Sequence, residues 1–219
     1  LWLRDQTSVD NLAIIGGTVS AEVGSDLAFL SEFWCPPSLF LAPRQPLRER
    51  PKVGVILRDW PAANPQAFGL QMLPTLERLS ACFDLTLISL DAATDALTLQ
   101  TLRSLRQIVW RPDRLGISDF MEKIAEQDVL LTARAHGAIC GACVGRSSVI
   151  LEIEPKLRTV HNMLPRVTSI VPPPYDADVI VARLEEALAV SHETIVAEVR
   201  RNTAESERAL AAVLQGASA

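Results

Sequence analysis

The chain has 219 residues and a mass of 23.9 kDa, enough for one large α/β domain, or one and a half small ones, with a substantial core. Its net charge of −5 and pI near 5.3 argue against a nucleic-acid-binding surface, which requires clustered positive charge. No apolar run approaches the roughly 18 residues that a membrane span requires. Four cysteines in a chain of this length do not suggest a disulfide framework, so we expect a cytoplasmic protein.

The first part of the chain, residues 1–33, is expected to be the end of a larger domain. Residues 1–5 resemble the last residues of a strand, and Ser8 is the expected N-cap of a short helix. A return strand is expected within 18–23, and Asp26 is expected to begin a second short helix. Because a buried strand needs neighbouring strands, this beginning predicts that a front part of the protein precedes the sequence.

A proline-rich stretch, 34–51, is followed by a regular alternation of short apolar runs and helical patterns. The expected strands are 53–57, 85–90, 107–110, 128–132, 149–153 and 169–171. The expected helices are 65–82, 92–105, 117–126, 136–144, a short one from 156, and a helical tail, 177–214, capped by Asp176. Apolar strands separated by helices indicate a sheet that is buried on both faces. We therefore predict a doubly wound, mostly parallel, Rossmann-like α/β fold.

One polar cluster follows the expected strand 128–132 and begins a helix, with the sequence Arg134-Ala-His136-Gly137. In a parallel doubly wound sheet, ligands bind beyond the carboxyl ends of the strands. The amides that open a helix attract anions, and Arg134 adds a forked donor. Gly137 permits a close approach of the backbone, and His136 can transfer a proton. The alternative is a structural His136 that caps its own helix.

Lys156 occupies the corresponding position after the next strand, 149–153. Two successive strand-to-helix turns would thereby place Arg134, His136 and Lys156 on one rim, where they could bind one anion. The alternative for Lys156 is an ordinary solvated surface side chain.

Two Arg-Asp pairs also follow expected strands. Arg4 and Asp5 suggest a helix-capping arrangement in which Arg4 pairs with Asp5. Arg58 and Asp59 have the same topological position, and we expect a solvated ion pair there.

The pair Cys140-Gly-Ala-Cys143 invites a redox or zinc interpretation. A zinc site needs further ligands at suitable spacing, whereas Cys35 and Cys82 are isolated in the sequence. We therefore expect Cys140 and Cys143 to be small buried residues that let a helix approach the sheet, and we expect no metal site.

Together these clusters resemble the polysaccharide pyruvyl transferase family. Its members attach ketal pyruvyl groups to cell-surface glycans, with phosphoenolpyruvate as donor. Three stretches carry the resemblance: Arg4-Asp5-x-x-Ser8 followed by an Asp26-led helix, Thr132-x-Arg134-x-His136-Gly137, and Glu154-Pro155-Lys156.

The resemblance implies a GT-B-like architecture of two Rossmann-like domains with the active site in the cleft between them. This chain would be the C-terminal half. Residues 1–33 would end the first domain, 34–51 would be a linker and 52–190 the C-terminal domain. The C-terminal helix, 191–219, would cross back toward the first domain.

The resemblance also implies roles for particular residues. Arg134, His136 and Lys156 would hold the phosphate and carboxylate of phosphoenolpyruvate, with Gly137 beside them and Arg4 facing the cleft. His136 and Arg134 would be catalytic, with His136 transferring the proton. Phosphoenolpyruvate is a co-substrate, and no other cofactor is implied. The acceptor would be a glycan or a lipid-linked sugar, bound in the cytoplasm or at the inner face of the membrane.

Two other functions fit the same residues. A cleft lined by Arg and Lys also suits the diphosphate of a nucleotide sugar, as used by a GT-B glycosyltransferase or an epimerase. A non-catalytic accessory or remnant domain is the third interpretation, and we expect the isolated fragment to turn over little.

Overall fold

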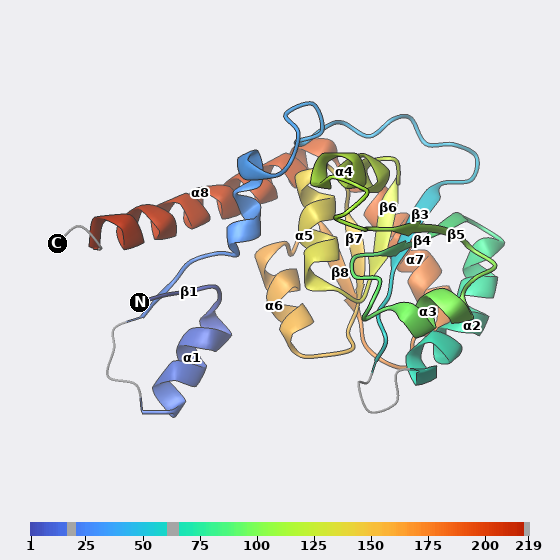
Figure 1. The fold of residues 1–219 in the computed structure, drawn as a ribbon, viewed down its shortest axis with the longest axis horizontal. Coiled ribbons are helices and arrows are strands. Elements are labelled where there is room, and N and C mark those ends of the chain that lie inside the picture. Colours follow the sequence, from blue (N-terminus) through green and yellow to red (C-terminus); the bar gives the residue numbers. More distant parts are fainter. Residues whose placement is uncertain (17–20, 61–65, 217–219) are drawn as a thin grey trace.

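The computed structural model describes residues 1–16, 21–60 and 66–216. At its centre lies a sheet of six parallel strands in the spatial order β5-β4-β3-β6-β7-β8 (Figure 1). The strands are β3 (Lys52–Ile56), β4 (Asp84–Ser89), β5 (Arg106–Val109), β6 (Val129–Thr132), β7 (Ser148–Leu151) and β8 (Thr168–Val171). Numbered within the sheet, this is the order 3-2-1-4-5-6 of a doubly wound Rossmann fold. The predicted fold class is confirmed.

Helices cover both faces of the sheet (Figure 1). On one face, Val53 of β3 packs in a cluster with Met72 and Leu184. On the other face, Ile56 of β3 packs in a cluster with Met121. The first face carries α2 (Gln66–Ser80), α3 (Ala96–Thr101) and α7 (Ala177–Leu188), and the second carries α4 (Ile117–Ala125), α5 (Ala135–Cys143) and α6 (Lys156–Met163). Burial of both faces explains why the central strands, such as β6 and β7, are fully buried and mostly apolar, whereas the edge strand β5 begins with exposed polar residues.

Most elements of the sheet domain begin and end within two residues of the expected positions, but α3 is shorter than expected. A helix is expected over 92–105, and the structure has Ala96–Thr101. The carboxylate of Asp91 accepts the backbone N–H groups of Ala93 at 3.1 Å and Thr94 at 3.3 Å. This local turn competes with helical hydrogen bonding and delays the start of the helix.

Residues 1–33 include a second, smaller sheet beside α8 (Figure 1). Its two parallel strands are β1 (Trp2–Leu3) and β2 (Glu22–Val23), and α1 (Gln6–Ile14) lies between them in the sequence. The expected return strand, 18–23, is thus found in its last part, while its positions 18–20 lie outside the described residues.

The N-cap of α1 is Asp5, so the expectation of Ser8 as the cap was wrong. Asp5 has an extended backbone, with φ −154° and ψ 160°. Its Oδ1 accepts the backbone N–H of Ser8 at 2.8 Å and the Ser8 hydroxyl at 2.9 Å. The two polar side chains form one capping unit, and the helix begins before Ser8 because the carboxylate reaches three residues forward.

Asp26 is a cap, as predicted, and its carboxylate accepts the N–H of Ala28 at 3.0 Å. The single short helix expected after it is instead a pair of 3₁₀ helices, η1 (Leu27–Phe29) and η2 (Ser31–Phe33). Leu30 separates them because its ψ of 57° lies outside the helical region.

The helical tail consists of two helices. Asp176 caps α7, as predicted, by accepting the N–H groups of Asp178 and Val179. The chain breaks at Ser191, whose hydroxyl accepts the N–H of Thr194 at 3.2 Å and so begins α8 (His192–Gly216). Neither α8 nor any other helix in the described part of the chain is long and apolar enough to cross a membrane.

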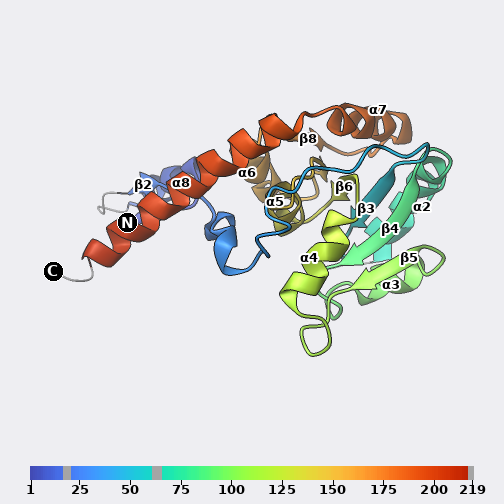
Figure 2. The same ribbon diagram turned by 90° about the horizontal axis from the view of Figure 1, so that it is seen from above.

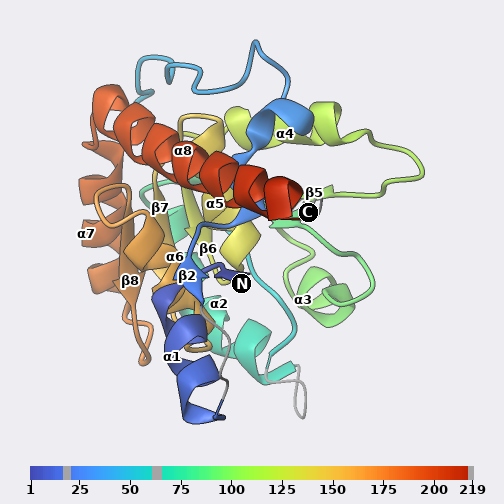
Figure 3. The same ribbon diagram turned by 90° about the vertical axis from the view of Figure 1, so that its left-hand side faces the viewer.

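The long helix α8 runs back along the N-terminal segment (Figures 2 and 3). That it crosses toward a first domain stays a prediction. The hydroxyl of Thr203 donates to the carbonyl of Phe29 at 3.0 Å, and the hydroxyl of Ser25 donates to Oδ1 of Asn202 at 2.9 Å. These contacts attach the first 33 residues to the sheet domain.

The proline-rich segment 34–51 is also attached to the sheet domain. The N–H of Leu41 donates to the carbonyl of Cys143 at 2.8 Å, and the guanidinium of Arg44 donates to the carbonyl of Leu188 at 2.6 Å. Its role as a linker between two domains stays a prediction.

Candidate active site

A pocket of about 470 Å³ lies beside the carboxyl ends of β3 and β6. The chain leads from β3 to β4 on one side of β3, and from β6 to β7 on the opposite side of the sheet. The loops after β3 and β6 therefore lead away from each other, and in folds of this strand order ligands bind between them. The ionisable side chains of the lining are those of Arg4, Arg58, Arg134, His136, Glu154 and Lys156. The apolar part includes Trp34, Leu90, Trp110, Ile117, Phe120 and Met121.

The structure brings together four of the five predicted site residues, Arg4, Arg134, His136 and Lys156, around this pocket. His136 is the second residue of α5, and its exposed ring has no hydrogen-bond partner within the described residues. The N-cap position belongs to Arg134, so His136 is not the cap of its own helix. Its imidazole is therefore available to a ligand.

The turn that leads from β6 into α5 is held by Thr132, which is fully buried. Its hydroxyl accepts the N–H of Arg134 at 3.0 Å and donates to the carbonyl of Arg134 at 2.9 Å. No side chain caps α5, and Ala135 and His136 at its start line the pocket. The positive end of the helix dipole thereby faces the pocket.

Gly137, the fifth predicted residue, is buried behind the pocket and is absent from its lining. A Cβ atom on Gly137 would lie 2.4 Å from Oγ1 of Thr132, and one on Gly141 would lie 2.4 Å from Cδ1 of Leu130. The two glycines let α5 lie close against β6. Gly137 thus supports the site indirectly, because its lack of a side chain lets α5 pack close to β6.

Replacing Gly137 with alanine is expected to destabilise the protein by about 1–3 kcal/mol, the usual cost of overpacking. The new methyl group would displace the Thr132 side chain, which holds the turn before α5. Chemical denaturation measures the loss. Gly69→Ala is the control, because Gly69 also lies within a helix, α2, and a Cβ there has no neighbour closer than 3.8 Å. Equal stability of the two variants would contradict the close packing of α5.

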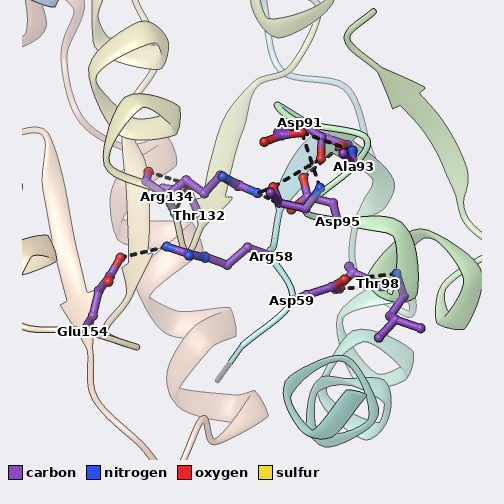
Figure 4. A network of polar contacts seen from close by, with 12 residues as sticks. Arg58, Asp59, Asp91, Ala93, Asp95, Thr98, Thr132, Arg134 and Glu154 are labelled. Atoms are coloured by element: carbon purple, nitrogen blue, oxygen red, sulfur yellow. Dashed lines mark hydrogen bonds and ion pairs between the residues drawn. The ribbon is translucent and has the colours of Figure 1, made fainter. Parts of the chain in front are cut away.

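The guanidinium of Arg134 reaches away from α5 to the loop before α3 (Figure 4). Its Nη2 forms an ion pair with Oδ1 of Asp95 and donates to the hydroxyl of Thr94 at 2.9 Å. Asp95 also accepts the hydroxyl of Ser89 at 2.8 Å and is almost fully buried. Burial raises the pKa of Asp95 above its usual value, although its hydrogen bonds with Ser89 and Arg134 act in the opposite direction.

A second carboxylate, Glu154, lies between two cations of the pocket. Its Oε1 is 3.1 Å from Nη1 of Arg58 and 2.9 Å from Nζ of Lys156. The Arg58 guanidinium also lies over the ring of Trp60, 5.1 Å from its centre. Lys156 is half exposed, and its ammonium group is paired with a carboxylate. It therefore differs from an ordinary surface lysine that contacts only solvent.

The expected ion pair between Arg58 and Asp59 is wrong. Arg58 pairs with Glu154, while Asp59 accepts the backbone N–H groups of Leu97 at 3.1 Å and Thr98 at 2.8 Å (Figure 4). The reason is the neighbouring position of β3 and β4, which brings the end of β3 next to the start of α3.

Arg4 reaches the pocket from the N-terminal segment. It pairs with Asp5 at 3.2 Å, as expected, and also with Asp26 at 3.5 Å. Its side chain is nevertheless 42% exposed, so the guanidinium can still meet a ligand.

The two cysteines of α5 contribute apolar packing. Cys143 is buried, and Cys140 is partly buried and lines the pocket. Burial raises the pKa of the Cys140 thiol to about 12 and raises that of Cys143 as well. Both thiols therefore stay protonated at neutral pH and are poor nucleophiles.

Sequence reasoning missed Asp95, Glu154 and the aromatic side of the pocket as functional features. Glu154 was noted only as part of a motif, and Asp95 was placed inside an expected helix. Trp34 and Trp110 carried no periodic signal. Trp110 stacks on Phe120 with 5.6 Å between ring centres, and their proximity depends on the fold.

Comparison with solved structures supports the fold. A sucrose-phosphate synthase from Thermosynechococcus elongatus superposes with a TM-score of 0.61 at 12% identity, covering 99% of this chain and 58% of that one. A structure from E. coli described as trehalose-6-phosphate bound with UDP-2-fluoro glucose gives 0.55 at 16% identity, covering 96% and 60%. These neighbours share the GT-B fold. The chain spans about three fifths of the length of either structure.

Comparison with curated protein sequences finds no significant match. A family model described as polysaccharide pyruvyl transferase matches residues 1–155. This range is more than half of the chain, and it includes the turn after β6 with Arg134 and His136. The chain belongs to the polysaccharide pyruvyl transferase family.

Proposed function

We propose that the protein transfers a pyruvyl group, as a ketal, from phosphoenolpyruvate to a sugar of a cell-surface polysaccharide or its precursor. The observation that carries the proposal is the meeting of Arg4, Arg134, His136 and Lys156 around one pocket at the start of α5. Phosphoenolpyruvate is small and carries both a phosphate and a carboxylate. The N-terminus of a helix together with arginine guanidinium groups and a lysine ammonium group suits both of these anions.

The reaction forms two C–O bonds at the central carbon of the donor. One sugar hydroxyl adds to this carbon, and a proton is added to the methylene carbon, which becomes the methyl group. The second hydroxyl then displaces the phosphate. Of the two hydroxyl protons, one balances the methyl group and the other leaves with inorganic phosphate, so no oxidant or reductant is required.

The pocket residues divide these tasks. Lys156 and Arg4 neutralise the phosphate and carboxylate, and Arg134 stabilises the charge that develops on the departing phosphate. His136 transfers the proton, because its ring is exposed in the pocket and unpaired within the described residues. Glu154 forms ion pairs with Arg58 and Lys156, so a bound dianion must share or displace these contacts.

Isothermal titration calorimetry with phosphoenolpyruvate tests the binding step. Lys156→Gln is expected to weaken binding about tenfold, because a hydrogen bond to a charged group contributes about 1.5–3 kcal/mol and this side chain is partly exposed. Lys123→Gln is the matched control, since Lys123 pairs with Glu126 on the surface of α4 and does not line the pocket. Absence of phosphoenolpyruvate binding, or equal affinities of the two variants, would contradict the proposal.

A glycosyltransferase that uses a nucleotide sugar is the second candidate. It is favoured by the similarity to sucrose-phosphate synthase and by the aromatic side of the pocket, where Trp34 and Trp110 could contact a base. Titration with UDP-glucose separates the two functions. Tight binding of UDP-glucose together with no binding of phosphoenolpyruvate would favour this second candidate.

A further inference from the structure

We propose that Asp95 is the positioning residue for Arg134, and that Asp59 frees it for this task by taking over its capping role. The importance of Arg134 for catalysis rests on the proposed function. The positioning itself is a property of the fold and can be measured separately.

Asp95 occupies the N-cap position of α3, where an aspartate normally accepts backbone N–H groups of the first turn. Its side chain makes no such bond. The N–H groups of Leu97 and Thr98 are accepted instead by the carboxylate of Asp59, which comes from the end of β3. The helix is thus capped by a residue 38 positions earlier than Leu97.

The carboxylate of Asp95 is turned toward the pocket side of the loop. It accepts the Ser89 hydroxyl and forms the ion pair with Arg134, and its side chain is only 1% exposed. A buried carboxylate is costly unless it is paired and hydrogen-bonded, and this one has both kinds of partner. The arrangement therefore commits Asp95 to Arg134.

Arg134 in turn depends on this contact. Within the described residues, its side chain is held only through Nη2, by Asp95 and Thr94, while Nε is buried and has no hydrogen-bond partner. An arginine held at one end by a fixed carboxylate loses little further freedom when it binds a ligand. The carboxyl ends of three neighbouring strands, β4, β3 and β6, thereby together fix the position of the Arg134 guanidinium (Figure 4).

The test uses Asp95→Asn, which keeps the shape of the side chain and removes its charge. We expect the Arg134 side-chain signals in ¹⁵N-detected NMR to change from slow to fast rotation about the Nε–Cζ bond. We also expect kcat/KM for pyruvyl transfer to fall about ten- to a hundredfold, as expected for a lost hydrogen bond between charged groups. Asp178→Asn is the control, because Asp178 is an exposed carboxylate that pairs with Arg78 and does not line the pocket.

The outcomes separate the positioning from the function. If Arg134 rotates equally slowly in wild type and in Asp95→Asn, the positioning role is wrong, whatever the activity. If rotation changes but the full-length wild-type protein does not turn over phosphoenolpyruvate, the proposed function fails and the positioning stands. Should Asp95→Asn not fold, Ser89→Ala removes the hydroxyl that orients Asp95, and a smaller change of the same sign is expected; no change there would also overturn the proposal.

Discussion

Replacement of His136 by alanine is expected to lower kcat for pyruvyl transfer by about 10²–10⁴-fold, the usual contribution of a positioned general acid or base. The imidazole is exposed at the start of α5 and lines the pocket, so its loss removes the proton-transfer group without opening the core. Steady-state kinetics of the full-length protein, with phosphoenolpyruvate as the varied substrate, measures the change. Because the cations remain, KM should change much less than kcat.

The matched control for this prediction is His192→Ala. His192 begins α8 and does not line the pocket, so the variant should keep the activity of the unmodified protein. Circular dichroism of both variants reports whether the fold is retained. A folded His136→Ala protein with an unchanged kcat would show that another group moves the proton.

Replacement of Arg146 by methionine is expected to destabilise the protein by about 3 kcal/mol or more. The Arg146 side chain is 5% exposed and donates to five backbone carbonyls, those of Ala42, Ala125, Gln127, Val144 and Gly145. Each buried acceptor that is left unsatisfied costs about 1–3 kcal/mol. The variant would lose the hydrogen bonds that hold together three parts of the chain: the segment after η2, the end of α4 and the end of α5.

This side chain remains charged at neutral pH, although burial lowers its pKa to about 10. Urea unfolding of Arg146→Met, with exposed Arg183→Met as the control, measures the difference in free energy. The expected loss of about 3 kcal/mol is a large part of the free energy of unfolding of a typical domain, which is about 5–15 kcal/mol. A loss below about 1 kcal/mol in Arg146→Met would mean that water can replace the guanidinium at these carbonyls.

The fold was predictable because its signals are local. Most strands of the main sheet are short apolar runs, and the long helices have apolar positions at helical spacing, so the alternation of elements follows from neighbouring residues. The turn after β6 was predictable for the same reason, since Arg134, His136 and Gly137 are consecutive or nearly so. The misplaced start of α3 also has a local cause, the Asp91 turn, whose side-chain hydrogen bonds compete with those of a helix.

The partners of the site residues depended on the tertiary structure. Asp95 and Arg134 are 39 residues apart, and Arg58 and Glu154 are 96 apart. These pairs form because parallel strands that are distant in the sequence end at one edge of the sheet. The amino-acid sequence by itself determined the doubly wound fold and the family motifs. Only the order of the strands in space decided which carboxylate meets which cation, because an ion pair depends on distance through space and not on separation along the chain.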